Sequence, residues 1–485
     1  MRVTGLAAVV AVVASVGVPT LALGDQCHFT GWWRGWCDPN WWTPHAPGSG
    51  DMAYVGSDAG LDTAYAFVSG DCSAVCEWLD VGYNPNCVGV VEVSGPNASL
   101  DVSRNAYVGA SGVGYMVQTG GNVSIGDVLI LGDYEGASGT YDLQGGQLSA
   151  DIVEVGREGR GEFLQSGGTN TCSLQIVPWA GSPGGTYGLS GGTLQIGSRL
   201  DVGGIGGGQA TLALSGGRIV QEPGAPGDAF MYVTENNGEV RGWAEQVDLP
   251  GFLDNSGRVI ADGGDLDLSG FAEVRNFVSN PADQGNGWYA ENQGRLTLPP
   301  VYMDPNDIPD DGNYPTPCNW GERADDGDID LVNSFRAEFY GLEALTPNDI
   351  GFTCTLLDPC AIDVPNAPGL PGSWGTLVGV WDFEEIGDWD YDHVDMIFRY
   401  DSLRVEELVA EGLNIDELAL YYWDPNGPDP NWVLADNQSY DGTHFRATYT
   451  HQSSVFSRMW AIYIPEPATL GLLGLGGLAF LRRRR

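Results

Sequence analysis

Lysine is absent from the sequence, and arginine is scarce. The 21 basic residues are all arginines, and they compare with 64 acidic residues. The formal net charge of −43 describes a surface that repels nucleic acid and attracts cations, so we expect no nucleic-acid partner. The HExxH motif of zinc proteases and the P-loop of nucleotide-binding proteins are also missing. No catalytic constellation emerges from the residues, and we predict a protein that is not an enzyme.

Glycine, in contrast, is abundant. The chain of 485 residues contains 72 glycines, and 42% of its residues are apolar, which excludes a disordered chain. Apolar runs interrupted by glycine indicate short strands joined by turns rather than long helices. The chain is too long for one ordinary domain, so we expect two or three domains of the all-β class.

Of the nine cysteines, seven occur in groups whose close spacing suits local disulfides in an oxidising compartment. The groups are Cys27/Cys37, Cys72/Cys76/Cys87 and Cys354/Cys360. Zinc sites of the common kinds need paired CxxC spacing, or cysteine and histidine at fixed offsets, and the sequence has neither. Because nine is odd, at least one thiol stays free or pairs with another molecule, and the connectivity remains open.

The N-terminus has the three parts of a secretory signal. Arg2 precedes an apolar run over residues 6–18, and small residues at positions 22 and 24 provide a cleavage site. We therefore predict a signal peptide over residues 1–24, formed as an isolated helix, with a retained membrane anchor as the alternative.

The C-terminus reads IPEPATLGLLGLGGLAFLRRRR. A helix over the apolar run 468–481 would measure about 21 Å, which is less than the roughly 30 Å of a hydrocarbon core. The terminal arginines would remain cytoplasmic. This order of elements resembles the PEP-CTERM sorting tail of Gram-negative bacteria that make exopolysaccharide. The sorting residues would be Pro465, Glu466, Pro467, Arg482, Arg483, Arg484 and Arg485.

The resemblance covers residues 464–485 and implies a route for the protein rather than an activity. An exosortase-type processing enzyme in the inner membrane would recognise the tail while its helix is transiently inserted there. Cleavage near Pro465 and Pro467 would then release the protein to the cell surface or the extracellular space. Retention of the tail as a transmembrane anchor is the alternative that the residues leave open.

The middle of the chain repeats with a period of about 24 residues. A Gly-Gly pair follows a short apolar strand at five places between Gly120 and Gly217, and Gly70 and Gly95 continue the same register. Alternate strand residues share a face, so the positions four and two residues before each glycine are predicted to point inward. The first column contains Ala66, Val91, Met116, Tyr141, Phe163, Tyr187 and Leu212.

This period predicts a right-handed parallel β-solenoid over residues 61–300, in which stacked coils bury one continuous core. Tyr141, Phe163 and Tyr187 would form one interior aromatic ladder, and corner glycines would supply positive φ. An antiparallel sandwich is the alternative, although it needs no constant period. Residues 25–60, rich in Trp and Cys, would cap the open end. Their segment 42–56 resembles the opening coil of autotransporter-like solenoid passengers.

Residues 301–330 are rich in Asp and Pro and are predicted to be an acidic linker. The stretches 375–386, 392–401, 417–425 and 444–464 alternate apolar and polar residues between Asp, Asn, Gly and Pro turns. This pattern predicts an antiparallel β-sandwich over residues 331–463, with one short helix over 402–411. The sorting tail at 464–485 would complete the chain.

Five tryptophans offer a binding hypothesis. Exposed indoles stack on sugar rings, and the surroundings implied by the tail are rich in exopolysaccharide. The alternative is that the indoles pack as the small core of the cap, because large aromatics bury much area. The candidate carbohydrate-binding residues are Trp32, Trp33, Trp36, Trp41 and Trp42.

Calcium is the cofactor that the acidic segments favour, because clustered carboxylates are hard oxygen ligands. Asp325, Asp326, Asp328 and Asp330 form the densest cluster. Their order fits neither the EF-hand loop nor the GGxGxD nonapeptide, so an acidic linker without an ion is the alternative.

From these features we predict an exported structural or adhesive protein of the cell surface or extracellular matrix. The alternative from another class is a polysaccharide lyase or hydrolase, because a solenoid face can present paired carboxylates 5 to 10 Å apart, roughly the separation such enzymes need. Acids that would point outward, and so supply such a pair, are Asp127, Asp151, Glu154, Glu158 and Asp201. Charges of this kind are more commonly just solvated.

Overall fold

The computed structural model describes residues 24–57, 63–179, 181–203, 208–223, 230–233, 238–249, 252–255, 257–271, 273–275, 286–303, 316–321, 331–344, 350–359, 375–400, 406–407, 409–410, 419–424, 431–441, 444–450 and 459–465. Almost all of these residues are strand or turn, so the fold is all-β. Helical residues in the described part are η1 (Pro39–Trp41) and residues 406–407 and 409–410. The two predicted signal helices lie outside the described residues, and no described helix is long and apolar enough to cross a membrane.

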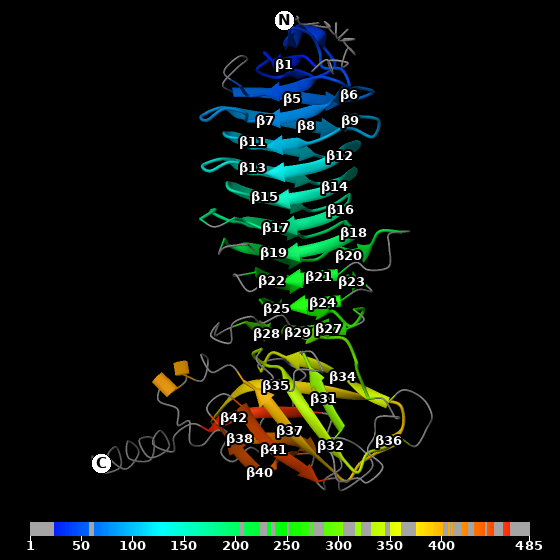
Figure 1. Ribbon diagram of the computed structural model, residues 1–485, viewed down its shortest axis with the longest axis vertical. Coiled ribbons are helices and arrows are strands. Elements are labelled where there is room, and N and C mark those ends of the chain that lie inside the picture. Colours follow the sequence, from blue (N-terminus) through cyan, green and yellow to red (C-terminus); the bar gives the residue numbers. More distant parts are fainter. Residues whose placement is uncertain are drawn as a thin grey trace, which may run out of the picture.

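Stacked coils form a rod that extends from the N-terminal end of the molecule to a second β region at its base (Figure 1). The rod is the predicted parallel β-solenoid and has about nine turns. One side is an eleven-stranded sheet in which every pair is parallel. Its strands are β2 (Arg34–Gly35), β5 (Thr63–Ser69), β8 (Val88–Ser94), β11 (Val113–Gln118), β13 (Ser138–Leu143), β15 (Arg160–Gln165), β17 (Gly185–Leu189), β19 (Ala210–Ser215), β22 (Gly238–Trp243), β25 (Arg258–Asp262) and β28 (Gly287–Glu291).

The rest of each coil belongs to a sixteen-stranded sheet. Long strands of this sheet have a register shift near the middle, where other coils break into two strands; β12, for instance, pairs with both β9 and β10. The strands are β1 (Gln26–Phe29), β3 (Trp42–Thr43), β4 (Met52–Val55), β6 (Ser73–Cys76), β7 (Trp78–Val81), β9 (Ser99–Val102), β10 (Ala106–Val108), β12 (Asn122–Leu131), β14 (Gln147–Val155), β16 (Thr169–Ile176), β18 (Thr193–Val202), β20 (Arg218–Gln221), β21 (Phe230–Val233), β23 (Gln246–Asp248), β24 (Phe252–Asn255) and β27 (Glu273–Arg275).

The interior ladder is confirmed residue by residue. Tyr141 pairs in register with Phe163, and Phe163 pairs with Tyr187. All three rings are buried and nearly parallel, with centroids 4.9 Å and 4.5 Å apart. The same column continues through Met116 and Leu212 in the neighbouring coils. Stacked coils therefore place equivalent residues above one another, as the sequence period predicts.

The second inward column contains two glutamines, which satisfy the buried tyrosine hydroxyls. Tyr141 donates a hydrogen bond of 2.6 Å to Gln118 in the preceding coil, and Tyr187 donates one of 2.6 Å to Gln165. Between them, Phe163 has no hydroxyl, and the residue in the place of the glutamine is the apolar Leu143. A buried polar group without a partner costs free energy. A tyrosine in the first column is therefore matched by a glutamine in the second, and the phenylalanine is matched by a leucine.

Glycine meets two different needs at the coil corners. In the Gly145-Gly146 pair it is the second residue that has positive φ, at 85°, and a Cβ on the first would lie 2.8 Å from the backbone oxygen of Thr119. The prediction of positive φ is therefore correct for the second glycine of the pair. The first glycine, on which the repeats were aligned, is required because neighbouring coils approach closely there.

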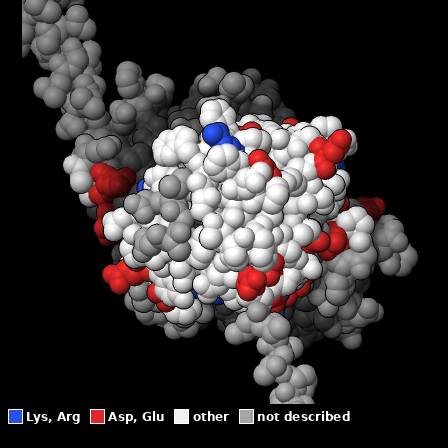
Figure 2. Space-filling view, turned by 90° about the horizontal axis from the view of Figure 1, so that it is seen from above, with Lys and Arg blue, Asp and Glu red and all other residues white. Residues whose placement is uncertain are grey.

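Both ends of the rod are covered. At the N-terminal end β3 pairs antiparallel with β1, and Phe29, Trp36 and Trp42 fill the open core. Figure 2 views this end along the rod and shows mainly uncharged residues with Asp and Glu around the rim. At the other end β26 (Asp265–Asp267) and β29 (Arg295–Thr297) of the last coils belong to a sheet that continues into the C-terminal region.

The C-terminal region contains two larger sheets, antiparallel apart from the parallel pair of β26 and β29, and a two-stranded one, β33 (Glu343–Ala344) with β36 (Trp389–Asp390). Phe335 of the five-stranded sheet contacts Phe352 and Phe383 of the eight-stranded sheet, with ring centroids 5.8 Å and 5.0 Å away. The eight-stranded sheet holds β26 (Asp265–Asp267), β29 (Arg295–Thr297), β30 (Val301–Met303), β34 (Ile350–Leu357), β35 (Gly375–Ile386), β38 (Ala419–Asp424), β39 (Asn431–Leu434) and β42 (Met459–Pro465). The five-stranded sheet holds β31 (Thr316–Trp320), β32 (Phe335–Tyr340), β37 (His393–Arg399), β40 (Asp436–Tyr440) and β41 (His444–Thr450).

The stretch predicted as an acidic linker contains two strands. β30 pairs with β34, and β31 pairs with β32. Trp320 at the end of β31 is fully buried. Composition indicated a linker because Asp and Pro dominate the stretch, but its few apolar residues are enough to add edge strands to both sheets.

Candidate functional site

The tryptophan cluster divides into a buried part and an exposed part. Trp36 and Trp42 pack edge to face with centroids 4.6 Å apart, and the Trp42 indole donates 2.9 Å to the backbone oxygen of Trp36. These two form the cap core that was the alternative to a sugar site. Trp32 and Trp33 are 68% and 60% exposed. Trp41 is half-buried, with the Arg34 guanidinium 4.6 Å from its ring centroid.

A pocket of about 370 Å³ lies where the exposed part meets the first coils. The segment containing β2 runs beside β5, with Arg34 opposite Ala66 and Gly35 opposite Phe67. Alternation along β5 and β8 turns Tyr65, Phe67 and Glu92 outward on this face. The pocket lining is Trp33, Arg34, Phe67, Ser69, Glu92 and Ser94.

The pocket combines aromatic faces with charged and hydroxyl groups. The Trp33 ring lies 5.6 Å from the Tyr65 ring, at an interplanar angle of 54°. The Tyr65 hydroxyl donates to the Glu92 carboxylate, and burial together with this bond raises the pKa of Tyr65 to about 12. The tyrosine therefore keeps its proton at neutral pH and holds Glu92 in place. Sugars have apolar C–H faces and polar edges, and this mixture of apolar surface and fixed polar groups suits them.

A disulfide fixes the exposed segment to the solenoid. It joins Cys37, just after β2, to Cys72, just after β5. The predicted local pairing of Cys27 with Cys37 is therefore wrong: β1 and β2 lie in different sheets, so Cys27 faces the cap core instead. Cys76 and Cys354, which the spacing also assigned to local bridges, keep buried thiols, while Cys360 lies outside the described residues.

The outward acids do not all sit in solvent. Glu154 and Asp201 are buried, and their carboxylates pair with Arg157 at 2.8 Å and Arg199 at 2.5 Å. Burial raises the pKa of Asp201 to about 6, against the lowering effect of Arg199. Asp127 pairs with Arg104 at 3.5 Å, whereas Asp151 and Glu158 are exposed or half-exposed. The predicted calcium residues, Asp325, Asp326, Asp328 and Asp330, lie outside the described residues.

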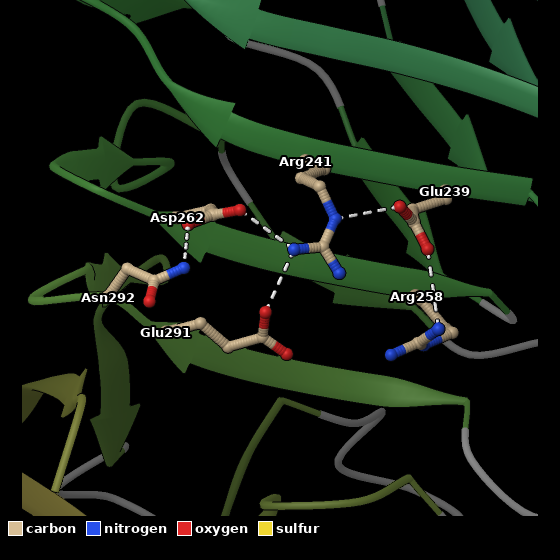
Figure 3. A network of polar contacts seen from close by, with 6 residues as sticks. All are labelled: Glu239, Arg241, Arg258, Asp262, Glu291 and Asn292. Carbon is tan, nitrogen blue, oxygen red and sulfur yellow. Dashed lines mark hydrogen bonds and ion pairs between the residues drawn. The ribbon is translucent and has the colours of Figure 1, made fainter.

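A denser charge network, which the sequence reasoning missed, lies near the C-terminal end of the solenoid (Figure 3). Arg241 of β22 donates to Glu239 at 2.9 Å, to Asp262 at 2.8 Å and to Glu291 at 2.8 Å. Burial alone would lower the pKa of Arg241, but these hydrogen bonds raise it. Hydrogen bonds from Asn292 and Arg241 lower the pKa of Asp262. Three successive coils are thus joined on their outer face. The signal in the sequence is charged residues at equivalent coil positions.

Comparison with known proteins identifies only the tail. The PEP-CTERM protein-sorting motif matches residues 464–485. The chain carries a PEP-CTERM sorting motif. This motif implies an exported protein that an exosortase sorts through the membrane to the cell surface. No curated protein and no solved structure matches the chain.

The PEP-CTERM motif begins inside the folded protein. Its first two residues, Ile464 and Pro465, end strand β42 and pair with Thr376 and Gly375 of β35. β42 lies between β35 and β38, and its Trp460 and Ile462 are buried. The sorting residues Glu466, Pro467, Arg482, Arg483, Arg484 and Arg485 lie outside the described residues. Processing beyond Pro465 would therefore leave the last strand whole.

Proposed function

We propose that this protein is a non-catalytic component of the cell surface or extracellular matrix that adheres to exopolysaccharide through the pocket at the N-terminal end of its solenoid. The observation that carries the proposal is the exposure of Trp33, which lines that pocket, and of its neighbour in sequence Trp32. Large aromatic side chains left in water, when other indoles of the same cap are buried, favour a binding role.

The net charge of the molecule restricts the class of polysaccharide that the pocket can bind. A net charge of −43 opposes strongly anionic polysaccharides. Glu92 accepts hydrogen bonds and Arg34 donates them, so the pocket suits the hydroxyl groups of neutral sugar units. One stacking contact contributes about 1 kcal/mol. Adhesion therefore depends on many copies on one cell, acting through avidity.

The position of the pocket agrees with a surface role. β42, in which the PEP-CTERM motif begins, lies in the region beyond the C-terminal end of the rod, whereas the pocket lies at its N-terminal end (Figure 1). A protein held at its C-terminal end would present the N-terminal cap outward. We propose that the solenoid is the spacer and the cap is the adhesive tip.

The test is a titration of tryptophan fluorescence in the full-length protein with the organism's own exopolysaccharide. We expect the Trp33→Ala variant to bind about fivefold more weakly, which corresponds to one lost stacking contact of about 1 kcal/mol. The matched control is Trp179→Ala, because Trp179 is 49% exposed but lies on another coil. Equal binding by the two variants would refute the proposal that sugar binds in this pocket. An unchanged fluorescence spectrum in the native protein would refute sugar binding altogether.

A polysaccharide-cleaving enzyme remains the second candidate, because the network around Arg241 brings acidic and basic groups together. Both oxygens of Glu239 and of Asp262 already accept hydrogen bonds, which favours a structural clamp. The residues 188–192 also form a GxSxG pattern, but Gly191 and Gly192 are a corner pair of the repeat, and Ser190 donates to the Gln165 backbone at 3.3 Å. Release of reducing sugar during the titration, lost in Glu239→Gln, would favour the enzyme.

A further inference from the structure

Three different donor side chains meet within the N-terminal cap, and none of them lines the pocket. The Sγ atom of Cys27 lies 3.7 Å from Nδ1 of His45, and this nitrogen lies 3.8 Å from Oδ2 of Asp51. All three atoms fall within 4.8 Å of one another. We propose that Cys27, His45 and Asp51 form a binding site for a zinc ion that holds three segments of the cap together.

The distances suit a tetrahedral ion. Zinc lies about 2.3 Å from sulfur and about 2.0 Å from nitrogen or oxygen, which places tetrahedral ligands about 3.3 to 3.6 Å apart. The observed separations of Cys27 to His45 and of His45 to Asp51 exceed these values by only a few tenths of an ångström. Nδ1 also lies 2.9 Å from the backbone oxygen of Ala46, so a bound metal would replace the proton that this nitrogen donates there.

The donor set selects the class of metal. A thiolate and an imidazole disfavour Ca²⁺ and Mg²⁺, which prefer oxygen ligands throughout. Zinc accepts sulfur, nitrogen and oxygen together, and three protein ligands leave a fourth position for water. The His45 side chain is 47% exposed, so the fourth position faces solvent.

Surrounding groups orient the three ligands. Nε2 of His45 lies 3.0 Å from Oδ2 of Asp25, the carboxylate partner that metal-bound histidines commonly have. The Asp51 carboxylate accepts the Gly48 amide at 2.8 Å and the Asp25 amide at 2.9 Å.

The fold explains how ligands from three segments meet. β1 carries Cys27 and pairs with β4 on one side, which sets Asp51 just ahead of that strand. On the other side β1 pairs antiparallel with β3, and the chain leaves β3 toward His45. A metal ion here would join the edge strand, the middle strand and the turn before β4. The ion would strengthen the N-terminal end of the solenoid, where the first coil has no preceding coil to pack against.

The test uses Co²⁺ as a spectroscopic substitute for zinc in the metal-free full-length protein. We expect one equivalent to bind and to produce the charge-transfer absorption of a thiolate ligand together with the visible bands of a four-coordinate ion. Zinc should displace the cobalt and should raise Tm, because a ligand that binds only the folded state stabilises it. Cys27→Ser should abolish the charge-transfer band.

Two exposed positions protect the test against misfolding of the buried Cys27→Ser variant. His45→Gln should weaken cobalt binding at least tenfold, and Asp25→Asn should weaken it less, since Asp25 only orients the ring. The controls are Cys172→Ser, which removes a buried thiol of the solenoid, and His393→Gln, which changes a histidine of the C-terminal region. Both should bind cobalt as the native protein does.

The proposal is refuted if native protein shows no thiolate band, if the band survives in Cys27→Ser, or if thiol counting finds Cys27 oxidised in a disulfide. Loss of sugar binding has no bearing on these outcomes, because the pocket residues and the metal ligands are different side chains. Conversely, Trp33→Ala should leave cobalt binding unchanged.

Discussion

In the solenoid each strand pairs with the equivalent strand of the next coil, whereas the C-terminal region combines short hairpins, such as β40 with β41, with pairs whose strands come from distant parts of the chain. β5 pairs with β8, which begins at Val88, and the partners are parallel throughout. β35 ends at Ile386 and pairs antiparallel with β42, which begins at Met459. Stability in the first case is a sum of neighbouring contacts, and in the second it depends on closing long loops.

This difference predicts how far the loss of one strand or contact should destabilise the rest of each region. A lost coil contact affects the two adjacent coils first, because coils touch only their neighbours. A lost central strand in the C-terminal region separates strands on both of its sides. The three predictions that follow test this contrast, from the largest expected effect to the smallest.

The largest effect is expected from removal of β42. A chain that ends before Met459 loses Trp460 and Ile462 from the core and leaves β35 and β38 without their shared neighbour. We expect the C-terminal antiparallel sheets to unfold while most coils remain folded, as a protease-resistant fragment detected by limited proteolysis and mass spectrometry. A chain that ends after Pro465 keeps β42 and should match the native protein. An intact C-terminal region in the shorter chain would contradict the contrast between the two regions.

A smaller effect is expected from crowding two coils. Gly132 has φ of 72°, and a Cβ there would lie 2.3 Å from the backbone oxygen of Arg160 in the next coil. Gly132→Ala should lower the free energy of unfolding by about 2 to 4 kcal/mol through backbone strain and overpacking. Gly136 is the control, because its φ is 82° but a Cβ there meets nothing within 4 Å.

Gly136→Ala should cost only about 1 kcal/mol, the strain of a left-handed alanine. Urea denaturation followed by circular dichroism measures both variants. Equal losses would mean that close approach between coils is not the reason for glycine at the corner.

The smallest effect concerns the interior ladder. Tyr141→Phe leaves the buried Gln118 side chain without its 2.6 Å partner, and Gln118→Leu leaves the Tyr141 hydroxyl without one. Each single change should cost about 1 to 3 kcal/mol. The double variant reproduces the arrangement of Phe163 with Leu143 in the next coil and should cost less than the sum of the two. Strict additivity of the three unfolding free energies would show that the pair is not coupled.

Much of the solenoid could be predicted from sequence because its repeat is one-dimensional. The column that contains Tyr141, Phe163 and Tyr187 is an interior ladder, since one corner glycine per coil sets the register of every strand after it. The prediction of an acidic linker over residues 301–330 was wrong for a related reason. β30 and β31 pair with β34 and β32, which lie outside the repeat, and the composition of a stretch does not show which strand it will pair with.

The candidate site was predicted only in part. Composition placed five indoles in the cap, but Trp33 and Trp36 flank the same strand, β2, and only the packing of that strand on β5 leaves Trp33 exposed and Trp36 buried. The Cys37–Cys72 disulfide likewise connects β2 to β5 across the first coil, a proximity that spacing does not show. Cys27 and His45 have no zinc spacing in the chain, yet the pairing of β1 with β3 and β4 brings them together.

By itself the sequence determined the destination of the protein and the repetitive half of its fold. The PEP-CTERM motif is a contiguous stretch of residues, and the coil period is a local pattern, so both can be read along the chain. Only the tertiary structure decided the order of the C-terminal strands, the disulfide partner of Cys37 and the meeting of Cys27 with His45 and Asp51. These depend on contacts between residues far apart in the sequence, which form because strand edges and apolar surface must be covered, whatever the separation along the chain.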